Sequence, residues 1–295
     1  MRKLRFAIFG NIFQAKKSVL TKALLCALEE HGAEIIIDRL FYNYLVNQLM
    51  LDVHPAELIE GNQFQADIAV SMGGDGTFLQ TAARVAEKQI PIVGINTGRL
   101  GFLADVGADE ITRAIETIYN DDYFVEERSA LQLSTSAGAN LNDPFALNEV
   151  AVMKRDSSSM ISIRVDVNGE YLGTYQADGL IVNTPTGSTG YALSVGGPIM
   201  MPESHTLGLV PVAPHSLNVR PITLSDNAEV TLTVESRNHN FLVAIDGRNH
   251  ACHEDTRLTI RRADHVVKIL RRNDNSFFRT LRTKLMWGSD IRIEG

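Results

Sequence analysis

The sequence predicts an α/β domain followed by an all-β domain, and two observations lead to this fold class. Over roughly the first 120 residues, short apolar runs alternate with segments whose apolar residues recur at helical spacing. After about residue 125, short β-rich stretches follow one another with turn signals between them. We therefore expect residues 1–125 to form the first domain, residues 126–270 the second, and residues 271–295 a terminal segment that packs back on the first domain.

Each element of the first domain is predicted from a local pattern. Residues 4–9 form an apolar run typical of a buried strand, and a helix follows because apolar residues recur at helical spacing between Val19 and Leu28. Gly32 stands where a C-terminal helix cap belongs. Further strands are predicted at residues 35–37, 66–72 and 92–95, and further helices at 77–88 and 108–119. Strands that alternate with helices favour a parallel sheet covered on both faces, so this domain is Rossmann-like in its layers.

The second domain is predicted from short β-rich stretches. They lie at residues 131–134, 150–153, 161–167, 171–176, 180–183, 230–234, 241–245 and 258–261. The dipeptides NG at 168–169 and DG at 246–247 are typical of two-residue hairpin turns. Residues 276–286 have the pattern of a short helix, which we assign to the terminal segment.

Composition and charge restrict the class of protein. The chain has 295 residues, of which 44% are apolar and 21% are charged, as in ordinary soluble globular proteins. No apolar run is long enough to span a membrane, and no signal-peptide pattern precedes the first strand. The net charge of −7 argues against broad binding to nucleic acids or membrane surfaces. Cys26 and Cys252 are far apart in the sequence, which favours a cytoplasmic location over a disulfide framework.

Charge is distributed unevenly along the chain. Residues 257–284 contain nine Lys or Arg and two Asp, a net charge of +7 on an acidic protein. This basic segment has two interpretations. It consists of solvated strand faces and contacts between subunits, or it forms a positive surface near an anionic substrate.

Several catalytic motifs are absent from the sequence, and their absence excludes enzyme classes. There is no GxxxxGK[ST] loop, no GxGxxG dinucleotide fingerprint, no HExxH zinc motif and no GxSxG nucleophile turn. The letters HACH at 250–253 resemble a metal-binding cluster, but one such cluster on a strand edge is more typical of solvated surface. We therefore predict no metal site built from the chain's own residues.

The segment GGDGT, residues 73–77, follows a predicted buried strand and opens a predicted helix. Ligands of open α/β sheets bind at this edge, where a glycine turn and a helix N-terminus present N–H groups to phosphate oxygens. A carboxylate at the centre of such a loop repels phosphate, so Asp75 needs another task. It could accept a proton from an attacking hydroxyl, hold a cation, or cap the helix that follows.

A second glycine-rich loop lies in the second domain, at residues 177–198, ADGLIVNTPTGSTGYALSVGGP. Its hydroxyl residues are Thr184, Thr186, Ser188, Thr189 and Ser194. Hydroxyl groups without a lysine suit ribose, amide and adenine edges better than bare phosphate. Asp178, which precedes a predicted strand, could accept two hydrogen bonds from a ribose diol.

Two further segments carry groups that suit a nucleotide. Asn148 and Glu149 precede a predicted strand and offer hydrogen-bonding groups to an adenine amino group or a ribose. The segment NTGRLGFLAD at 96–105 supplies another turn, in which Phe102 either stacks on a base or packs in the core.

Together these motifs resemble those of the bacterial NAD kinase family. GGDGT, NTGxLGF, NE and DGLIVxTPTGST-Y-LSxGGP occur in this order and spacing, and the resemblance covers roughly residues 4–270. It implies an N-terminal α/β domain, a C-terminal β-sandwich-like domain and NAD bound between them. It also implies transfer of the γ-phosphoryl group of ATP, used with Mg²⁺ or Mn²⁺, to the 2′-hydroxyl of the adenosine ribose of NAD, which makes NADP. A homo-oligomer, dimer or tetramer, is implied as well.

The same resemblance assigns roles to individual residues. Asp75 is the expected proton acceptor, and Gly73, Gly74, Gly76 and Thr77 are expected to bind phosphate. The residues expected to bind NAD are Asp75, Gly76, Phe102, Asn148, Glu149, Asp178, Thr186, Thr189, Gly190, Tyr191, Ala192, Leu193, Ser194, Ala213, Asp246 and Arg248.

The sequence departs from the family at three positions. Gly190 stands where many members have Ala, Gln176 where some have Arg, and Arg248 where some have Gln. The last two bear on the choice of phosphoryl donor and on the preference between NAD and NADH, which the sequence leaves open. Two other functions are compatible with GGDGT: a kinase for a lipid or sugar hydroxyl, and a non-enzymatic module that senses NAD.

Overall fold

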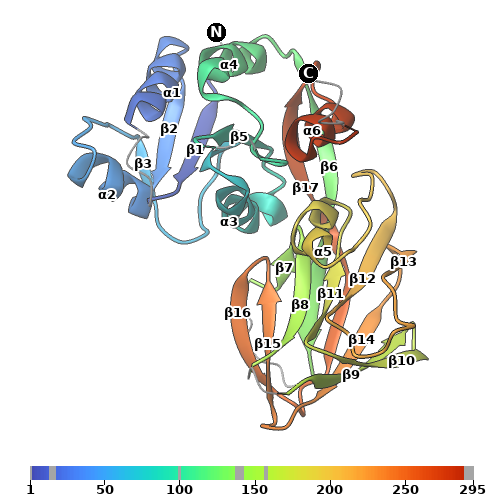
Figure 1. Ribbon diagram of the computed structural model, residues 1–295. Coiled ribbons are helices and arrows are strands. Elements are labelled where there is room, and N and C mark those ends of the chain that lie inside the picture. The colour runs from blue at the N-terminus through green and yellow to red at the C-terminus, as the bar shows by residue number, and fades with distance from the viewer. Residues whose placement is uncertain (1, 13–17, 99–100, 137–142, 156–158, 289–295) are drawn as a thin grey trace. The chain divides into compact units, whose positions relative to one another are not determined.

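The computed structural model describes residues 2–12, 18–98, 101–136, 143–155 and 159–288 (Figure 1). The chain separates into two compact units. Unit 1 consists of residues 1–127 and 267–295, and unit 2 consists of residues 128–266. The chain passes from one unit to the other along two long strands, β6 (Tyr123–Thr135) and β17 (Leu258–Arg272). The predicted fold class is confirmed, because unit 1 is an α/β structure and unit 2 is mostly β.

Unit 1 is built on parallel strands in the order β3-β2-β1-β4-β5. Their bounds are β1 (Arg5–Gly10), β2 (Glu34–Asp38), β3 (Glu57–Ile59), β4 (Ile68–Gly73) and β5 (Ile92–Asn96). All residues of β4 and β5 are buried, as expected when helices cover both faces of a parallel sheet. The order reverses between β1 and β4, so the carboxyl ends of these two strands form the switch point at which such sheets bind ligands.

The helices of unit 1 pack on both faces of this sheet. Their bounds are α1 (Ser18–Glu30), α2 (Arg39–Asn47), α3 (Asp75–Val85) with the 3₁₀ turn η2 (Ala86–Lys88), η3 (Ala108–Glu110), α4 (Ile111–Tyr119) and α6 (Phe277–Leu285). Residues of α1, α2 and α4 share one core cluster with Phe6 and Ile8 of β1. Helix α3 lies on the other face, where Gly94 of β5 leaves room for the ring of Phe78. None of the helices in the described ranges is long and apolar enough to cross a membrane.

The sequence patterns do not predict α2 or β3, and the reason is local. Helix α2 begins directly after β2, and its N-cap is Asp38, whose side chain accepts hydrogen bonds from the N–H groups of Leu40 and Phe41. The helix has only nine residues, with Phe41, Tyr44 and Leu45 buried, and strand β3 has three residues at the sheet edge. Elements this short show too few periods to be recognised in a sequence.

Unit 2 contains two sheets that face each other across one core. In the described ranges a six-stranded sheet has the order β13-β12-β11-β8-β15-β16, and the facing strands have the order β10-β9-β14-β17, with β6 and β7 attached. The remaining bounds are β7 (Phe145–Ala146), β8 (Glu149–Lys154), β9 (Ile161–Val167), β10 (Glu170–Ala177), β11 (Gly179–Asn183), β12 (Thr206–Val212), β13 (Ile222–Ser225), β14 (Val230–Glu235), β15 (Asn240–Ile245) and β16 (Arg248–His253). Alternate residues of both sheets, such as Val150 and Val152 of β8 with Val230 and Leu232 of β14, pack in this core.

Two short helical segments follow β11 and lie on the outer face of the six-stranded sheet. They are the 3₁₀ turn η4 (Thr186–Thr189) and the single-turn helix α5 (Tyr191–Ser194). Ala192 packs there against Ile181 and Val210, which point away from the main core. The polar loop at residues 184–194 is therefore tied to the sheet by its own small apolar cluster.

Candidate active site

The GGDGT segment joins the carboxyl end of β4 to the first turn of α3. Gly73 is confined by its neighbour, because a Cβ there would lie 2.1 Å from Thr77 Oγ1. Gly74 and Gly76 are exposed, and a Cβ on either would meet no atom within 4 Å. Exposed glycines at a helix N-terminus let an anionic ligand approach the backbone N–H groups closely.

A cavity of about 630 Å³ opens beside this segment. It lies at the switch point between β1 and β4, and its volume is typical of small-molecule sites, which span about 300–1,000 Å³. The cavity is lined by Phe9, Gly10, Asn11, Ile12, Asp38, Leu40, Gly74, Gly76, Thr77, Gln80, Thr81 and Arg84.

Asp75 is the first residue of α3, yet its carboxylate turns away from that helix. The N-cap position belongs to Gly74, and the cap makes no side-chain hydrogen bond. Asp75 Oδ2 accepts from the N–H of Phe102 at 2.8 Å, and Oδ1 accepts from Leu103 at 3.0 Å and Ala104 at 3.1 Å. The helix-capping interpretation is therefore wrong. The carboxylate instead holds the loop that follows β5.

Two more residues of unit 1 define the surroundings of Asp75. Gly101 lies directly against the carboxylate, since a Cβ on Gly101 would be 1.8 Å from Asp75 Oδ1. Lys284 in the last turn of α6 interacts electrostatically with Asp75. Burial lowers the pKa of Lys284, whereas the charge of Asp75 raises it. The C-terminal helix thus brings a cation into the neighbourhood of the acid.

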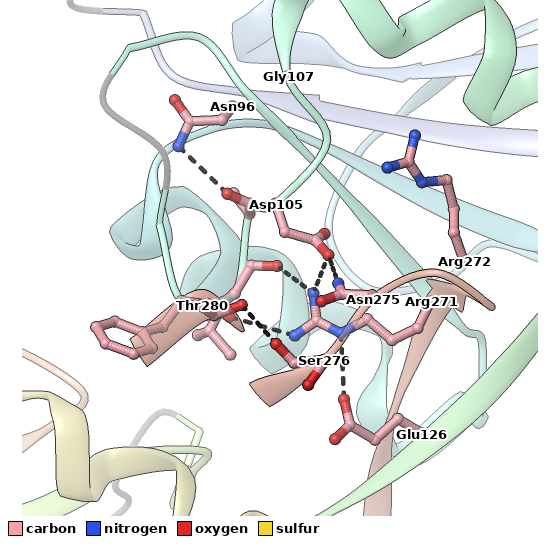
Figure 2. Close-up of polar contacts among 12 residues, drawn as sticks. Asn96, Asp105, Gly107, Glu126, Arg271, Arg272, Asn275, Ser276 and Thr280 are labelled. Carbon is pink, nitrogen blue, oxygen red and sulfur yellow. Dashed lines mark hydrogen bonds and ion pairs between the residues drawn. The ribbon is translucent and has the colours of Figure 1, made fainter. Parts of the chain in front are cut away.

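Arg271 of β17 contacts the same loop from its carbonyl side. Its Nη2 donates to the carbonyl of Phe102 and its Nη1 to that of Leu103, both at 3.2 Å. Its guanidinium also pairs with Asp105 at 2.7 Å and Glu126 at 3.1 Å, as Figure 2 shows. Burial raises the pKa of Asp105, and the guanidinium of Arg271 lowers it. Arg271 is only 5% exposed, so this is a buried ion-pair cluster.

Arg271 fits neither interpretation of the basic segment, because it is neither solvated nor placed on an open positive surface. A signal for its burial is present in the sequence. Val267, Ile269 and Arg271 are alternate residues of β17, and the first two are apolar and buried. A strand places such residues on one face, so the period of two indicates that Arg271 points inward as well.

In unit 2, Asn148 and Glu149 lie where the chain enters β8. Asp246, in the turn between β15 and β16, accepts from the N–H groups of Leu147 at 2.7 Å, Asn148 at 2.9 Å and Glu149 at 3.0 Å. This turn is the expected hairpin, with Asp246 at φ 45° and Gly247 at φ 80°. The carboxylate of Asp246 is thus engaged with the backbone that carries the Asn148–Glu149 pair.

The electrostatics of this pair are unusual for a surface loop. Burial, together with the nearby charge of Asp246, raises the pKa of Glu149 to about 8. Burial also raises the pKa of Asp246, although its bonds to the three N–H groups lower it. Asn148 Oδ1 and Glu149 Oε2 are buried and have no hydrogen-bond partner among the described residues. Two buried oxygen atoms without a hydrogen-bond partner thus lie next to each other in the sequence, at one end of β8.

All five hydroxyl groups of the hydroxyl-rich loop make hydrogen bonds within unit 2, those of Thr189 and Ser194 to the carbonyls of Thr186 and Tyr191. Thr184 Oγ1 donates to the carbonyl of Leu147 at 2.6 Å, and Ser188 Oγ to that of Pro185 at 2.6 Å. Thr186 is buried and accepts a hydrogen bond from Arg128 at 3.1 Å. These bonds engage the hydroxyls of Thr184, Thr186 and Ser188 within unit 2, and the contact of Thr186 with NAD stays a prediction. Their hydroxyls hold the loop together.

The second half of this loop is more accessible. Thr189 and Gly190 are half-buried, Leu193 is half-buried, and Tyr191 and Ser194 are exposed, whereas Ala192 is fully buried. A Cβ on Gly190 would lie 3.2 Å from Asn148 Nδ2 and 3.3 Å from Glu149 Oε2. The loop therefore packs directly beside the Asn148–Glu149 pair, and the glycine at 190 leaves space there.

The structure places Asp178 apart from this group, whereas Arg248 follows the Asp246 turn and pairs with Ile245, the partner of Val150 in β8. Asp178 pairs with Lys154 at 2.6 Å, and its N–H donates to Val212, the residue before Ala213. Strands β8 and β11 pair antiparallel, with Asn183 beside Glu149 at one end and Gly179 beside Met153 at the other. Asp178 and Lys154 therefore lie at the end opposite to Glu149. Arg248 Nη2 donates to the carbonyl of Phe145 at 2.6 Å.

The letters HACH fall on strand β16, at residues 250–253. His253 pairs with Asp255 at 3.1 Å, and Cys252 packs in the core between the sheets. Within the described ranges, no group of three or more His, Cys, Asp or Glu side chains is arranged to hold a metal ion.

Comparison with known proteins identifies the family. Residues 48–123 match the ATP-NAD kinase N-terminal domain, and residues 147–272 match the ATP-NAD kinase C-terminal domain. The chain is 59% identical over 290 residues to an NAD kinase of Bacteroides fragilis, covering 98% of this chain and 100% of the relative.

Solved structures of an NAD kinase and an NADH kinase have a similar fold. An NAD kinase from Archaeoglobus fulgidus in complex with ATP has a TM-score of 0.75 at 27% identity and covers 96% of this chain and 99% of its own. Yeast NADH kinase complexed with NADH has the same fold, with a TM-score of 0.87 at 20% identity, over 99% of this chain and 90% of its own. Both matched domain models and the bacterial relative lead to one conclusion: the chain belongs to the ATP-NAD kinase family.

Proposed function

We propose that this NAD kinase uses Asp75 to accept the proton that leaves the adenosine 2′-hydroxyl of NAD as the γ-phosphoryl group of ATP is attacked. One observation carries the proposal: the carboxylate is held by three N–H groups of one loop. An ionised carboxylate has about four acceptor positions, so one is left for a substrate hydroxyl. A general base fixed in this way is aligned before the substrate arrives.

The phosphates of ATP are proposed to bind at GGDGT, on Gly73, Gly74, Gly76 and Thr77. The exposed glycines and the positive end of α3 suit an anion, and the cavity of about 630 Å³ beside them has room for the rest of a nucleotide. The motif itself has no lysine. Lys284, whose charge interacts with Asp75, would supply a positive charge near the transferred group.

We propose further that a divalent cation, Mg²⁺ or Mn²⁺, accompanies ATP. The described residues include no cluster of His, Cys, Asp and Glu able to hold such an ion alone, and Asp75 is already engaged with three N–H donors. These residues fit a cation that arrives on the triphosphate. When bound, it would neutralise charge on the phosphoryl oxygens.

For NAD, the proposed main contacts are Asn148 and Glu149. Their buried oxygen atoms lack a partner, and leaving a buried polar atom unpaired costs about 1–3 kcal/mol. The adenine amino group or the ribose hydroxyls would provide the missing hydrogen-bond partners. In the adjacent loop Thr189, Tyr191 and Ser194 have accessible side chains, whereas Thr186 and Ala192 are buried. The family resemblance also proposes NAD contacts at Gly76, Phe102, Asp178, Gly190, Leu193, Ala213, Asp246 and Arg248.

The proposal is tested by incubating the protein with Mg-ATP and NAD and coupling the product to an NADP-specific dehydrogenase. NADP should form, and the 2′-deoxyadenosine analogue of NAD should bind without giving a phosphorylated product. Phosphate on that analogue would exclude the 2′-hydroxyl as the acceptor. Phosphorylation of a sugar or lipid in place of NAD would favour the other kinase functions, and binding without turnover would favour a sensing module.

We also propose that the protein is a cytoplasmic homo-oligomer. The two free cysteines fit a reducing compartment. Strand β10 lies at a sheet edge and exposes Tyr171 and Leu172, and such edges are sites of self-association. Light scattering should give a mass above the 32.5 kDa of one chain. A fully active monomer would reject the oligomer.

A further inference from the structure

We propose that Arg271 is a positioning residue for Asp75 and that it acts through the peptide units of residues 102–104. This inference rests on the proposed role of Asp75 as the proton acceptor. The two side chains hold opposite edges of the same stretch of backbone. Asp75 accepts from three consecutive N–H groups, and Arg271 donates to two consecutive carbonyl groups.

The peptide units of this loop are thereby fixed on both edges. Phe102 and Leu103 each donate an N–H to Asp75 and each accept from Arg271 through their carbonyl. The carbonyl of Ala104 accepts from Asn96 Nδ2 at 3.3 Å. The direction of the N–H groups therefore depends on where the guanidinium holds the carbonyls.

Arg271 is itself held firmly. It is 5% exposed and pairs with Asp105 and Glu126, and Asn275 donates to Asp105 as well (Figure 2). A guanidinium has five N–H donors in one plane, which is enough for two carboxylates and two carbonyls at once. A lysine ammonium has three donors and no fixed plane, so it would keep the charge and lose part of these contacts.

Loss of the Arg271 contacts should affect catalysis through the position of Asp75. If the carbonyl edge is released, the N–H groups move and the carboxylate of Asp75 moves with them. Misplacement of a catalytic group by about 1 Å can cost about 10²-fold in rate. Arg271 bonds to Phe102, itself a proposed NAD contact, through the backbone carbonyl, and the proposed main NAD contacts, Asn148 and Glu149, belong to unit 2. Arg271→Lys should therefore lower kcat about tenfold to a hundredfold and leave KM for NAD within about threefold.

The adjacent residue provides a matched control. Arg272 follows Arg271 on the same strand and pairs with two carboxylates, Glu110 at 2.8 Å and Asp274 at 3.2 Å. Its ion pairs do not involve residues 101–104. Arg272→Lys is thus the same substitution at an ion-paired arginine, and it should leave kcat within about twofold.

The first measurement is amide hydrogen exchange in the full-length protein. Exchange at Phe102, Leu103 and Ala104 should accelerate in Arg271→Lys and not in Arg272→Lys, because only the first variant releases the loop. Unchanged exchange at these three amides would overturn the inference whatever the activity. If Arg271→Lys does not fold, Glu126→Gln, which removes one anchor of the guanidinium, replaces it with the same expectations.

The second measurement is a double-mutant cycle with Asp75→Ala. If Arg271 acts through Asp75, the loss of kcat caused by Arg271→Lys should shrink to within about twofold when Asp75 is already absent. An equal loss in both backgrounds would overturn the positioning role and leave the role of Asp75 intact. Parental kcat in Asp75→Ala alone would instead reject the proposed proton acceptor, and the positioning role would fail with it.

Discussion

Gly101 and Asp75 are in such close contact that only glycine fits beside the carboxylate. A Cβ on Gly101 would lie 1.8 Å from Asp75 Oδ1 and 2.6 Å from its Cγ. Gly98, in the same segment, would meet no atom within 4 Å. The position of Asp75 is therefore fixed by the shape of the loop after β5 as well as by its three hydrogen bonds.

Gly101→Ala should consequently displace the carboxylate of Asp75 while leaving Asp75 in the sequence. We expect kcat to fall by at least about 10²-fold, as after misplacement of a general base. Gly98→Ala is the matched control and should retain nearly parental turnover, because its methyl group meets open space. Steady-state kinetics with the coupled NADP assay checks both variants. Parental kcat in Gly101→Ala would show that the site tolerates a displaced carboxylate.

Asp75→Asn removes both the proton acceptor and part of the loop's support. An asparagine presents an NH₂ group where one oxygen accepts an N–H, so at least one buried donor loses its partner, at a cost of about 1–3 kcal/mol. We expect kcat to fall about 10²- to 10⁴-fold and the melting temperature to fall by several degrees. Kinetics and thermal melting measure the two effects. Turnover within threefold of the parent would make Asp75 a purely structural residue.

The place of the GGDGT motif could be predicted from the sequence, whereas the hydrogen-bond partners of its Asp75 could not. The motif's place between β4 and α3 follows from local periodicity, which the sequence shows directly. The partners of Asp75 lie 27 to 29 residues away, and those of Asp246 lie 97 to 99 residues away. Such pairs depend on how loops close in three dimensions, and no local pattern encodes that.

The hydroxyl-rich loop shows a second limit of prediction from the sequence. Its composition correctly indicates many polar contacts, but composition does not distinguish a hydroxyl that binds a ligand from one that binds its own backbone. Ser188 and Thr184 donate to carbonyls within unit 2, and only the fold reveals this. Local hydrogen bonds of this kind are common for Ser and Thr in turns.

Asp246→Asn should loosen the Asn148–Glu149 pair. The carboxylate accepts three consecutive N–H groups, and an asparagine leaves at least one of these buried groups unpaired. We expect a lower melting temperature and a rise in KM for NAD of about fivefold or more, with a smaller effect on kcat. Asp255→Asn, at an exposed turn, is the control and should change neither value. A normal KM with normal melting would contradict the proposed support of this pair by Asp246.

The raised pKa of Glu149 makes the stability of the protein depend on pH in a predictable direction. Its folded-state pKa is about 8, against 4.5 for an ordinary glutamate, because the carboxyl is buried near Asp246. At neutral pH the folded state therefore keeps a proton that the unfolded state has lost, so the contribution of this group decreases as pH rises from about 4.5 to about 8. Glutamine does not ionise, so Glu149→Gln removes this decrease.

We therefore expect the melting temperature of Glu149→Gln, relative to the parent, to rise between pH 5 and pH 8. The rise should be on the order of several degrees, since each pKa unit corresponds to roughly 1.4 kcal/mol. Calorimetry without ligand measures it, and Glu235→Gln at an exposed position is the control. A difference that stays constant over this range would show that Glu149 is ionised in the folded protein. Its buried oxygen would then be a charged acceptor for the substrate and not a neutral carboxyl.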